Sequence, residues 1–101
     1  MYNIRYRQLA HEDLVSIFDN IYKDKPSVAF KYILKFENKI ELLSDNPKLG
    51  VECKQKNIHK DCRILIFENY LIFYEITENE IIIIRILNSR VNYTFLFSEL
   101  N

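Results

Sequence analysis

Hydrophobic and polar positions follow two different periods along the chain. Residues 2–7 alternate apolar and polar side chains, which predicts a short strand. From Leu9 to Lys23 the apolar residues recur every three or four positions, which predicts an amphipathic helix. A second helical stripe over residues 29–43 follows Pro26, a residue suited to the first turn of a helix. Because the connection between the stripes is short, we expect an antiparallel helix hairpin.

Three apolar runs follow a polar loop in the second half of the chain. They are residues 62–67, 70–76 and 80–87, and short polar joints separate them. This spacing predicts two tight turns and a three-stranded antiparallel meander. The predicted order is therefore β-α-α-β-β-β, a single α+β domain over residues 1–101 in which a two-helix hairpin packs on one face of an antiparallel sheet.

The three runs are apolar on both faces, whereas a strand with one face in water alternates. Pairing the runs through the two joints sets Arg63 opposite Tyr74 and Ile72 opposite Arg85. One predicted face carries Leu65, Tyr70, Ile72, Tyr74, Ile83, Arg85 and Leu87. The other predicted face carries Ile64, Ile66, Leu71, Phe73, Ile84, Ile86 and Asn88, with Arg90 next in phase. Composition alone favours this second face as the one that packs the helices.

Only one face can receive the helix hairpin, so something else has to cover the other. A large aliphatic side chain left in water forgoes about 1.5–3 kcal/mol relative to burial. An open apolar face is also an aggregation hazard. We therefore expect the apolar segment at residues 91–100 to cover part of the free face and a protein partner to cover the rest.

Composition and charge narrow the possible chemistry. Lys plus Arg number 14 and Asp plus Glu number 14, so any attraction to nucleic acid has to come from a local patch. The single glycine, Gly50, argues against glycine-rich phosphate loops and is expected to take a positive φ after the second helix. No run approaches the roughly 18 apolar residues of a membrane span and no signal-peptide core is present, which predicts a cytoplasmic protein.

The two cysteines, Cys53 and Cys62, are expected to be free thiols, because the cytoplasm keeps thiols reduced. With His59 they form the spacing Cys-x5-His-x2-Cys. This spacing matches no standard zinc signature, and a fourth ligand is not evident. We therefore expect neither a metal ion nor a cofactor.

Four stretches occur in a fixed order and together cover almost the whole chain. They are LAHEDLVSIFDNI, KIELLSDNPKLG, HKDCRILIFENYLIFYEI and IIIIRILNSR. In order and spacing they resemble toxins of the RelE/ParE superfamily from bacterial type II toxin–antitoxin modules. The resemblance implies the RelE/ParE toxin fold, with the helices on the face of Leu65, Tyr70 and Tyr74. It also implies a small cytoplasmic toxin linked to growth inhibition and plasmid stabilisation, silenced by a cognate antitoxin in a hetero-oligomer.

The superfamily divides by target, and the residues favour one branch. ParE-like toxins inhibit DNA gyrase, whereas RelE-like toxins cleave messenger RNA on the ribosome. Cleavage needs a group that activates the ribose 2′-hydroxyl and cations that stabilise phosphate charge. Our alignment puts Ile64 and Ile66 at the lysine positions of RelE-like enzymes and Leu71 at an arginine position. Asn88 replaces a histidine of many relatives. The resemblance therefore implies a ParE-like gyrase inhibitor.

Two alternatives remain open at this stage. The first is a RelE-like ribosome-dependent mRNA endonuclease, in which Arg90, Tyr93 and Asn88 are the catalytic candidates. The second is a non-toxic protein-binding domain. In the favoured interpretation, Asn88 and Arg90 bind the target just past the last strand.

The remaining site predictions concern the partner and the sheet. The residues expected to bind the antitoxin are Ile64, Ile66, Leu71, Phe73 and Ile84. Arg63 is expected to form an ion pair with Asp13, or with its neighbour Glu12, that anchors the first helix to the sheet, because a cation near a core is normally paired. Arg85 is expected to make the same kind of pair.

Overall fold

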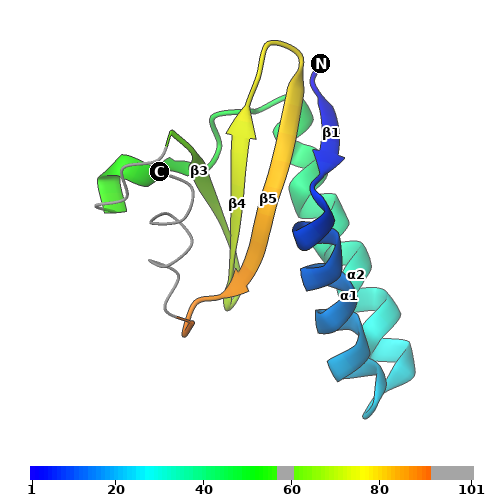
Figure 1. Cartoon of the computed structure of the whole chain (residues 1–101). Coiled ribbons are helices and arrows are strands. Elements are labelled where there is room, and N and C mark those ends of the chain that lie inside the picture. The colour runs from blue at the N-terminus through cyan, green and yellow to red at the C-terminus, as the bar shows by residue number, and fades with distance from the viewer. Residues whose placement is uncertain (57–60, 92–101) are drawn as a thin grey trace.

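In the part of the chain that the computed structural model describes, residues 1–56 and 61–91, two long helices lie against one face of a five-stranded sheet (Figure 1). The helices are α1 (Gln8–Tyr22) and α2 (Pro26–Glu41), and short 3-10 turns follow at η1 (Leu42–Ser44) and η2 (Cys53–Lys56). The strands are β1 (Asn3–Tyr6), β2 (Val51–Glu52), β3 (Arg63–Phe67), β4 (Tyr70–Ile76) and β5 (Glu80–Asn88). The predicted order of the main elements, β-α-α-β-β-β, is confirmed.

The sheet has the strand order β1-β5-β4-β3-β2. Strands β3, β4 and β5 form the predicted antiparallel meander. The sheet as a whole is mixed, because β1 pairs in parallel with β5, and Asn3 lies opposite Glu80. Parallel pairing needs a long connection, and here the helix hairpin and strands β2, β3 and β4 all lie between β1 and β5 in the chain. The two-residue strand β2 was not predicted, since it is too short to show an alternating pattern.

Each helix buries the apolar stripe that predicted it. Helix α1 buries Ala10 and Ile17, and α2 buries Phe36 and Ile40. Pro26 occupies the first turn of α2, where its missing N–H breaks no intrahelical hydrogen bond. The predicted helix boundaries are confirmed to within about a turn.

The main core lies between the helices and the face of the sheet that carries Leu65, Ile72 and Tyr74. Phe36 is completely buried there, and its ring centroid lies 4.6 Å from that of Phe67 and 5.3 Å from that of Tyr70. The resemblance therefore predicted the correct face for the helices. The prediction from composition alone was wrong, because the apolar side chains of the second face pack in a separate cluster of their own.

A β-bulge in β5 overturns part of the predicted register. Tyr74 pairs with Ile83 as predicted, but Phe73 pairs with Arg85, so Ile84 is the extra residue of the strand. Beyond the bulge the faces are exchanged relative to the prediction. Ile72 pairs with Ile86 rather than with Arg85. Ile86 thus joins the main core, and Leu87 joins the opposite side.

Tyr74 and Gly50 fix the loop that enters β2. The Tyr74 hydroxyl donates to the carbonyl of Pro47 at 2.7 Å and accepts from the N–H of Gly50 at 2.9 Å. A Cβ on Gly50 would lie 2.6 Å from the carbonyl oxygen of Ile64. The predicted positive φ at Gly50 is wrong, since no described glycine has one. Glycine is needed here because two backbones approach closely.

Candidate functional site

The second face of the sheet was predicted to be covered partly by residues 91–100 and partly by a protein partner, and several of its side chains are buried. Three of the predicted antitoxin-binding residues, Ile64, Phe73 and Ile84, are buried in a second apolar cluster. Leu71 packs against this cluster and is half-buried, whereas Ile66 is 53% exposed. Residues 91–100 were predicted to cover part of this face, and all of them except Val91 lie outside the described residues. Among the residues predicted to bind the antitoxin, Ile66 is thus the one with a largely exposed side chain.

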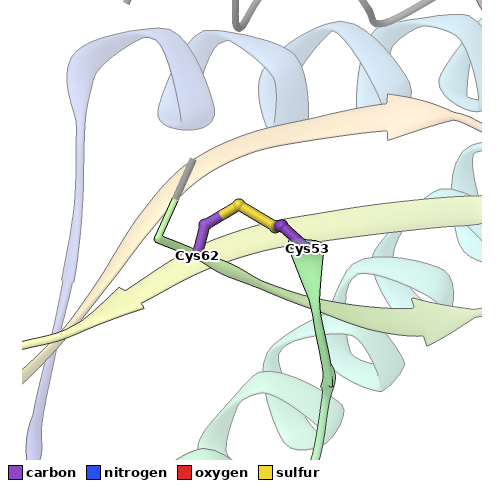
Figure 2. Close-up of a disulfide and its surroundings, with 2 residues drawn as sticks. All are labelled: Cys53 and Cys62. Atoms are coloured by element: carbon purple, nitrogen blue, oxygen red, sulfur yellow. A yellow bond between two sulfur atoms is a disulfide. The ribbon is translucent and has the colours of Figure 1, made fainter. Parts of the chain in front are cut away.

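A disulfide between Cys53 and Cys62 helps to form this cluster (Figure 2). The two Cα atoms lie 5.3 Å apart, and the N–H of Cys53 donates to the carbonyl of Cys62 at 2.9 Å. The predicted free thiols are therefore wrong. Pairing of β2 with β3 brings the two cysteines together, and that short strand left no signal in the sequence. His59, the third residue of the spacing considered for zinc, lies outside the described residues.

The ion pair that joins α1 to the sheet is made by Asp13 and Arg85. Arg85 donates to the carboxylate through Nε at 2.7 Å and Nη2 at 3.0 Å, and the N–H of Ile86 donates to Oδ2 at 2.9 Å. The hydrogen bond to Asp13 raises the pKa of the Arg85 guanidinium. The carboxylate therefore holds both the helix and the bulged backbone of β5. The pair predicted for Arg85 is confirmed.

The pair predicted between Arg63 and Asp13 is wrong. Arg63 donates to the carbonyl of Gly50 at 2.7 Å and to that of Lys48 at 3.3 Å, and its Nη2 lies 3.6 Å from the carboxylate of Glu52. The reason is topological. Strand β5 packs beside α1, whereas β3 lies two strands away in the sheet.

Asn88 and Arg90 lie at the end of β5, as predicted for target binding. The side-chain oxygen of Asn88 accepts from the N–H of Arg90 at 2.9 Å, which shapes the turn and leaves the Arg90 side chain exposed. Because of the bulge, Asn88 pairs with Tyr70. It therefore does not share a face with Phe73, as had been predicted. The two residues are therefore neighbours in a turn and are separated from the predicted antitoxin face. Tyr93 lies outside the described residues.

The helix hairpin carries an apolar groove that the sequence analysis missed. Its cavity volume is about 410 Å³, and its lining residues are Tyr6, His11, Leu14, Val15, Phe18, Ile33 and Glu37. Beside it, the ring of Phe18 lies 5.5 Å from that of Tyr22 and 5.1 Å from that of Phe30. The available signal was a set of apolar residues outside the buried stripes. These residues, all exposed, include Val15, Phe30 and Leu34.

Two acidic residues of α2 act on Tyr6, a lining residue of this helical groove. Burial raises the pKa of Tyr6 to about 12, and the nearby carboxylates of Glu37 and Glu41 add to the shift. The Tyr6 phenol is thus neutral at ordinary pH, and Glu37 supplies a negative charge at the groove wall. The helical groove therefore combines mostly apolar lining residues with the carboxylate of Glu37.

The raised pKa of Tyr6 predicts a loss of stability at alkaline pH. An ordinary tyrosine loses its proton near pH 10, so between pH 10 and 12 the unfolded chain releases a proton that the folded chain keeps. The contribution of Tyr6 to stability is full below pH 10 and disappears as the pH rises through 12. We expect Tyr6→Phe to show a shallower decline over this window in chemical denaturation. Parallel curves for the two proteins would contradict this.

The sequence and the fold of this chain are similar to those of known proteins. The family described as "ParE toxin of type II toxin-antitoxin system, parDE" matches residues 4–93. A solved structure titled "Chromosomal ParDE TA system from P. aeruginosa" is similar with a TM-score of 0.71 and 22% identity, covering 87% of this chain and 96% of that chain. No curated protein matches the sequence.

The fold and the family match together define a small α+β toxin of the RelE/ParE type. The chain belongs to the ParE toxin family of type II toxin–antitoxin systems, because the match covers most of its length. The similar solved structure supports the same fold, and at this level of identity it supports the fold alone. Within the described residues, no helix is long and apolar enough to cross a membrane.

Proposed function

We propose that this chain is a cytoplasmic toxin that arrests growth by inhibiting DNA gyrase and that a cognate antitoxin neutralises it in a hetero-oligomer. The observation that carries the proposal is the match to the ParE toxin family over residues 4–93. The gyrase target is the activity that the ParE-like branch implies. The alternative target, messenger RNA on the ribosome, is the activity of the RelE-like branch.

The described residues lack most groups that RNA cleavage needs at the expected positions. Ile64 is buried and Ile66 is exposed, and neither can stabilise the charge on a phosphate. Leu71 stands at the arginine position. Asn88 cannot transfer a proton near neutral pH, and its carboxamide oxygen is already bonded to the N–H of Arg90. These features support inhibition by binding over catalysis.

The antitoxin surface that we propose is the helical groove and not the second face of the sheet. The buried residues Ile64, Phe73 and Ile84 are not available to a partner unless the second cluster opens. The helical groove is open, and its walls come from both helices. Such a groove suits the apolar face of an amphipathic helix, with side chains spaced three or four residues apart.

The occupant of the helical groove should carry a positive charge where it passes Glu37. Glu37 lines the groove, and Glu41 lies close enough to add to the pKa shift of Tyr6. A lysine or arginine of the antitoxin beside these carboxylates would complement them and fix the direction of the bound helix. An antitoxin segment that folds on binding can cover such a surface.

Asn88 and Arg90 are the residues proposed to contact the target. Arg90 is exposed in the turn after β5, where a large partner can reach it. We expect induced expression of the chain to arrest growth with a DNA-damage response and intact messenger RNA. Arg90→Ala should weaken toxicity by roughly tenfold, equivalent to about 1.4 kcal/mol of target binding, and leave antitoxin binding unchanged.

The control is Arg5→Ala, which removes another exposed arginine, on β1 and far along the chain from the turn. Growth arrest should be followed together with a DNA-damage reporter and transcript integrity. Rapid cleavage of translated transcripts would assign the chain to the RelE-like alternative. Equal toxicity of Arg90→Ala and wild type would remove Arg90 from the target site.

A further inference from the structure

The apolar lining of the helical groove continues to the tip of the helix hairpin. The rings of Phe18, Tyr22 and Phe30 contact one another there, and the centroids of Tyr22 and Phe30 lie 6.2 Å apart. Leu34 follows Phe30 by one helical turn, and the two side chains are 59% and 60% exposed. Because Phe18 also lines the groove, the groove and the tip form one surface. This surface, the hairpin face, carries Val15, Phe18, Tyr22, Phe30, Ile33 and Leu34.

The hairpin face is accessible to another protein molecule. A continuous exposed apolar surface marks an interaction site, whereas single exposed apolar residues are common on monomers. The tip of the hairpin extends past the end of the sheet, so the sheet does not obstruct a partner there (Figure 1). The chain has a formal net charge of zero, so copies of it do not repel one another as whole molecules. A second copy of the chain can therefore approach this face without a charge barrier.

Charges of opposite sign flank the two sides of the hairpin face over its middle turns. With about 3.6 residues per turn, Glu12 and Asp19 fall on the side of α1 that lies beyond Val15 and away from α2. Lys31 and Lys35 fall on the opposite side, beyond the apolar residues of α2. All four charged side chains are exposed. The hairpin face thus has an acidic edge along α1 and a basic edge along α2.

We propose that two copies of this chain form a two-fold symmetric dimer through the hairpin face, with α1 of each copy packed against α2 of the other. A two-fold axis parallel to the hairpin produces this arrangement and sets the aromatic tips of the two copies against each other. The acidic edge of each copy then meets the basic edge of the other, and the four helices form a bundle with one apolar interior. A two-fold axis perpendicular to the hairpin would set acidic edge against acidic edge, so the charges favour the first arrangement.

The ring contact between Phe18 and Phe30 fixes which residues of α1 and α2 lie at equal height along the hairpin. Because α2 runs back along α1, Glu12 then lies close to the height of Lys35. In the dimer, Glu12 of each copy meets Lys35 of the other, and the symmetry forms this pair twice. The charged edges therefore fix the alignment of the two copies along the hairpin.

The same symmetry provides a partner for the acidic side chain inside the groove. His11 and Glu37 both line the groove, on α1 and α2 respectively, so Glu37 of each copy faces His11 of the other. An imidazole N–H can donate to a carboxylate, so this acid is not left unpaired in an apolar interior. The dimer and the proposed antitoxin occupy the same groove. The inference therefore rests on the proposed function only in that the antitoxin has to displace the second copy.

Sedimentation velocity of the purified full-length chain, without antitoxin, measures the association directly. We expect a monomer–dimer equilibrium with a dissociation constant on the order of 10 μM. A chain that stays monomeric at concentrations about tenfold higher would overturn the proposal. That result would leave the antitoxin surface to the binding measurement on the groove, so the two proposals fail separately.

Leu34→Asp and Leu9→Asp form a matched pair of variants. The two leucines are 59% and 55% exposed, but Leu9 lies in the first turn of α1, outside the hairpin face, where an acidic residue is tolerated. We expect Leu34→Asp to weaken the dimer by at least roughly 30-fold, because each copy then buries a carboxylate among apolar side chains. Leu9→Asp should dimerise like the wild type, and circular dichroism checks that both variants fold. Equal effects of the two variants, or none from Leu34→Asp, would overturn the assignment to this face.

An exchange of charges tests the direction of packing and leaves the apolar residues unchanged. Glu12→Lys and Lys35→Glu should each weaken the dimer by roughly fivefold, because each replaces two attractive pairs by two repulsive ones. The double variant restores both pairs with reversed sign and should dimerise within about twofold of the wild type. A double variant that associates as weakly as the single variants would contradict the packing of α1 against α2.

Discussion

Asp13→Ala is expected to lower the free energy of unfolding by about 2–3 kcal/mol. The substitution removes the acceptor of two hydrogen bonds from Arg85 and of one from the N–H of Ile86. The side chains of the pair are only 18% and 15% exposed, so the stranded guanidinium is poorly solvated. The backbone N–H at the bulge loses its acceptor as well. Chemical denaturation monitored by circular dichroism measures the effect.

Glu12→Ala is the matched control for Asp13→Ala. Glu12 is the neighbouring carboxylate on α1, and its described hydrogen bond is an exposed one from Gln8 at 3.0 Å. Its removal should change stability by no more than about 0.5 kcal/mol. The double variant Asp13→Ala with Arg85→Ala should cost less than the sum of the single variants by at least about 1 kcal/mol. Additive single effects would show that the two residues act independently.

Val15→Asp is expected to weaken binding of the antitoxin by roughly 100-fold, or about 2.7 kcal/mol. Val15 is 44% exposed and lines the helical groove, so a carboxylate there would be buried without a partner under an apolar helix. We expect a neighbouring reading frame to encode the antitoxin, and its product is the partner for the measurement. Calorimetric titration with the purified partner gives the affinity.

Val28→Asp makes the same chemical change at a similar exposure of 43%, on α2 and away from the groove lining. An acidic residue in the first turn of a helix is well tolerated, so this variant should bind and fold like wild type. If both variants bind normally, the helical groove is not the antitoxin surface. If both lose binding equally, the loss reflects the fold and not the groove.

The elements of this fold could be predicted because the apolar pattern is strongly periodic. Helix α1 shows a clear helical stripe, and the β3–β4 register was correct at Arg63 opposite Tyr74. The β5 register failed after Ile83, where four consecutive isoleucines fit the strand with or without a bulge. The sequence gives no preference there, and the carboxylate of Asp13 on another element holds the bulged backbone.

The candidate site could be predicted only in part, for reasons of topology. The pairing of Asp13 with Arg85 followed from the need to neutralise a cation near the core. The pair predicted for Arg63 was wrong, and avoiding this error would have required knowledge of which strand lies beside α1. The burial of Ile64 and Phe73 depends in part on Cys53 and Cys62, which come together through a strand of only two residues. Such a short strand carries no pattern that a sequence can reveal.

The parallel pairing of β1 with β5 has a consequence for synthesis. The first strand made, at Asn3–Tyr6, can take its place in the sheet only after the last strand, at Glu80–Asn88, has left the ribosome. The helix hairpin supplies every lining residue of the groove except Tyr6, contains only local connections and can form earlier. A nascent chain would then present most of the helical groove while its sheet is still unfinished. An antitoxin that binds there could engage the toxin during translation, before a complete toxin exists.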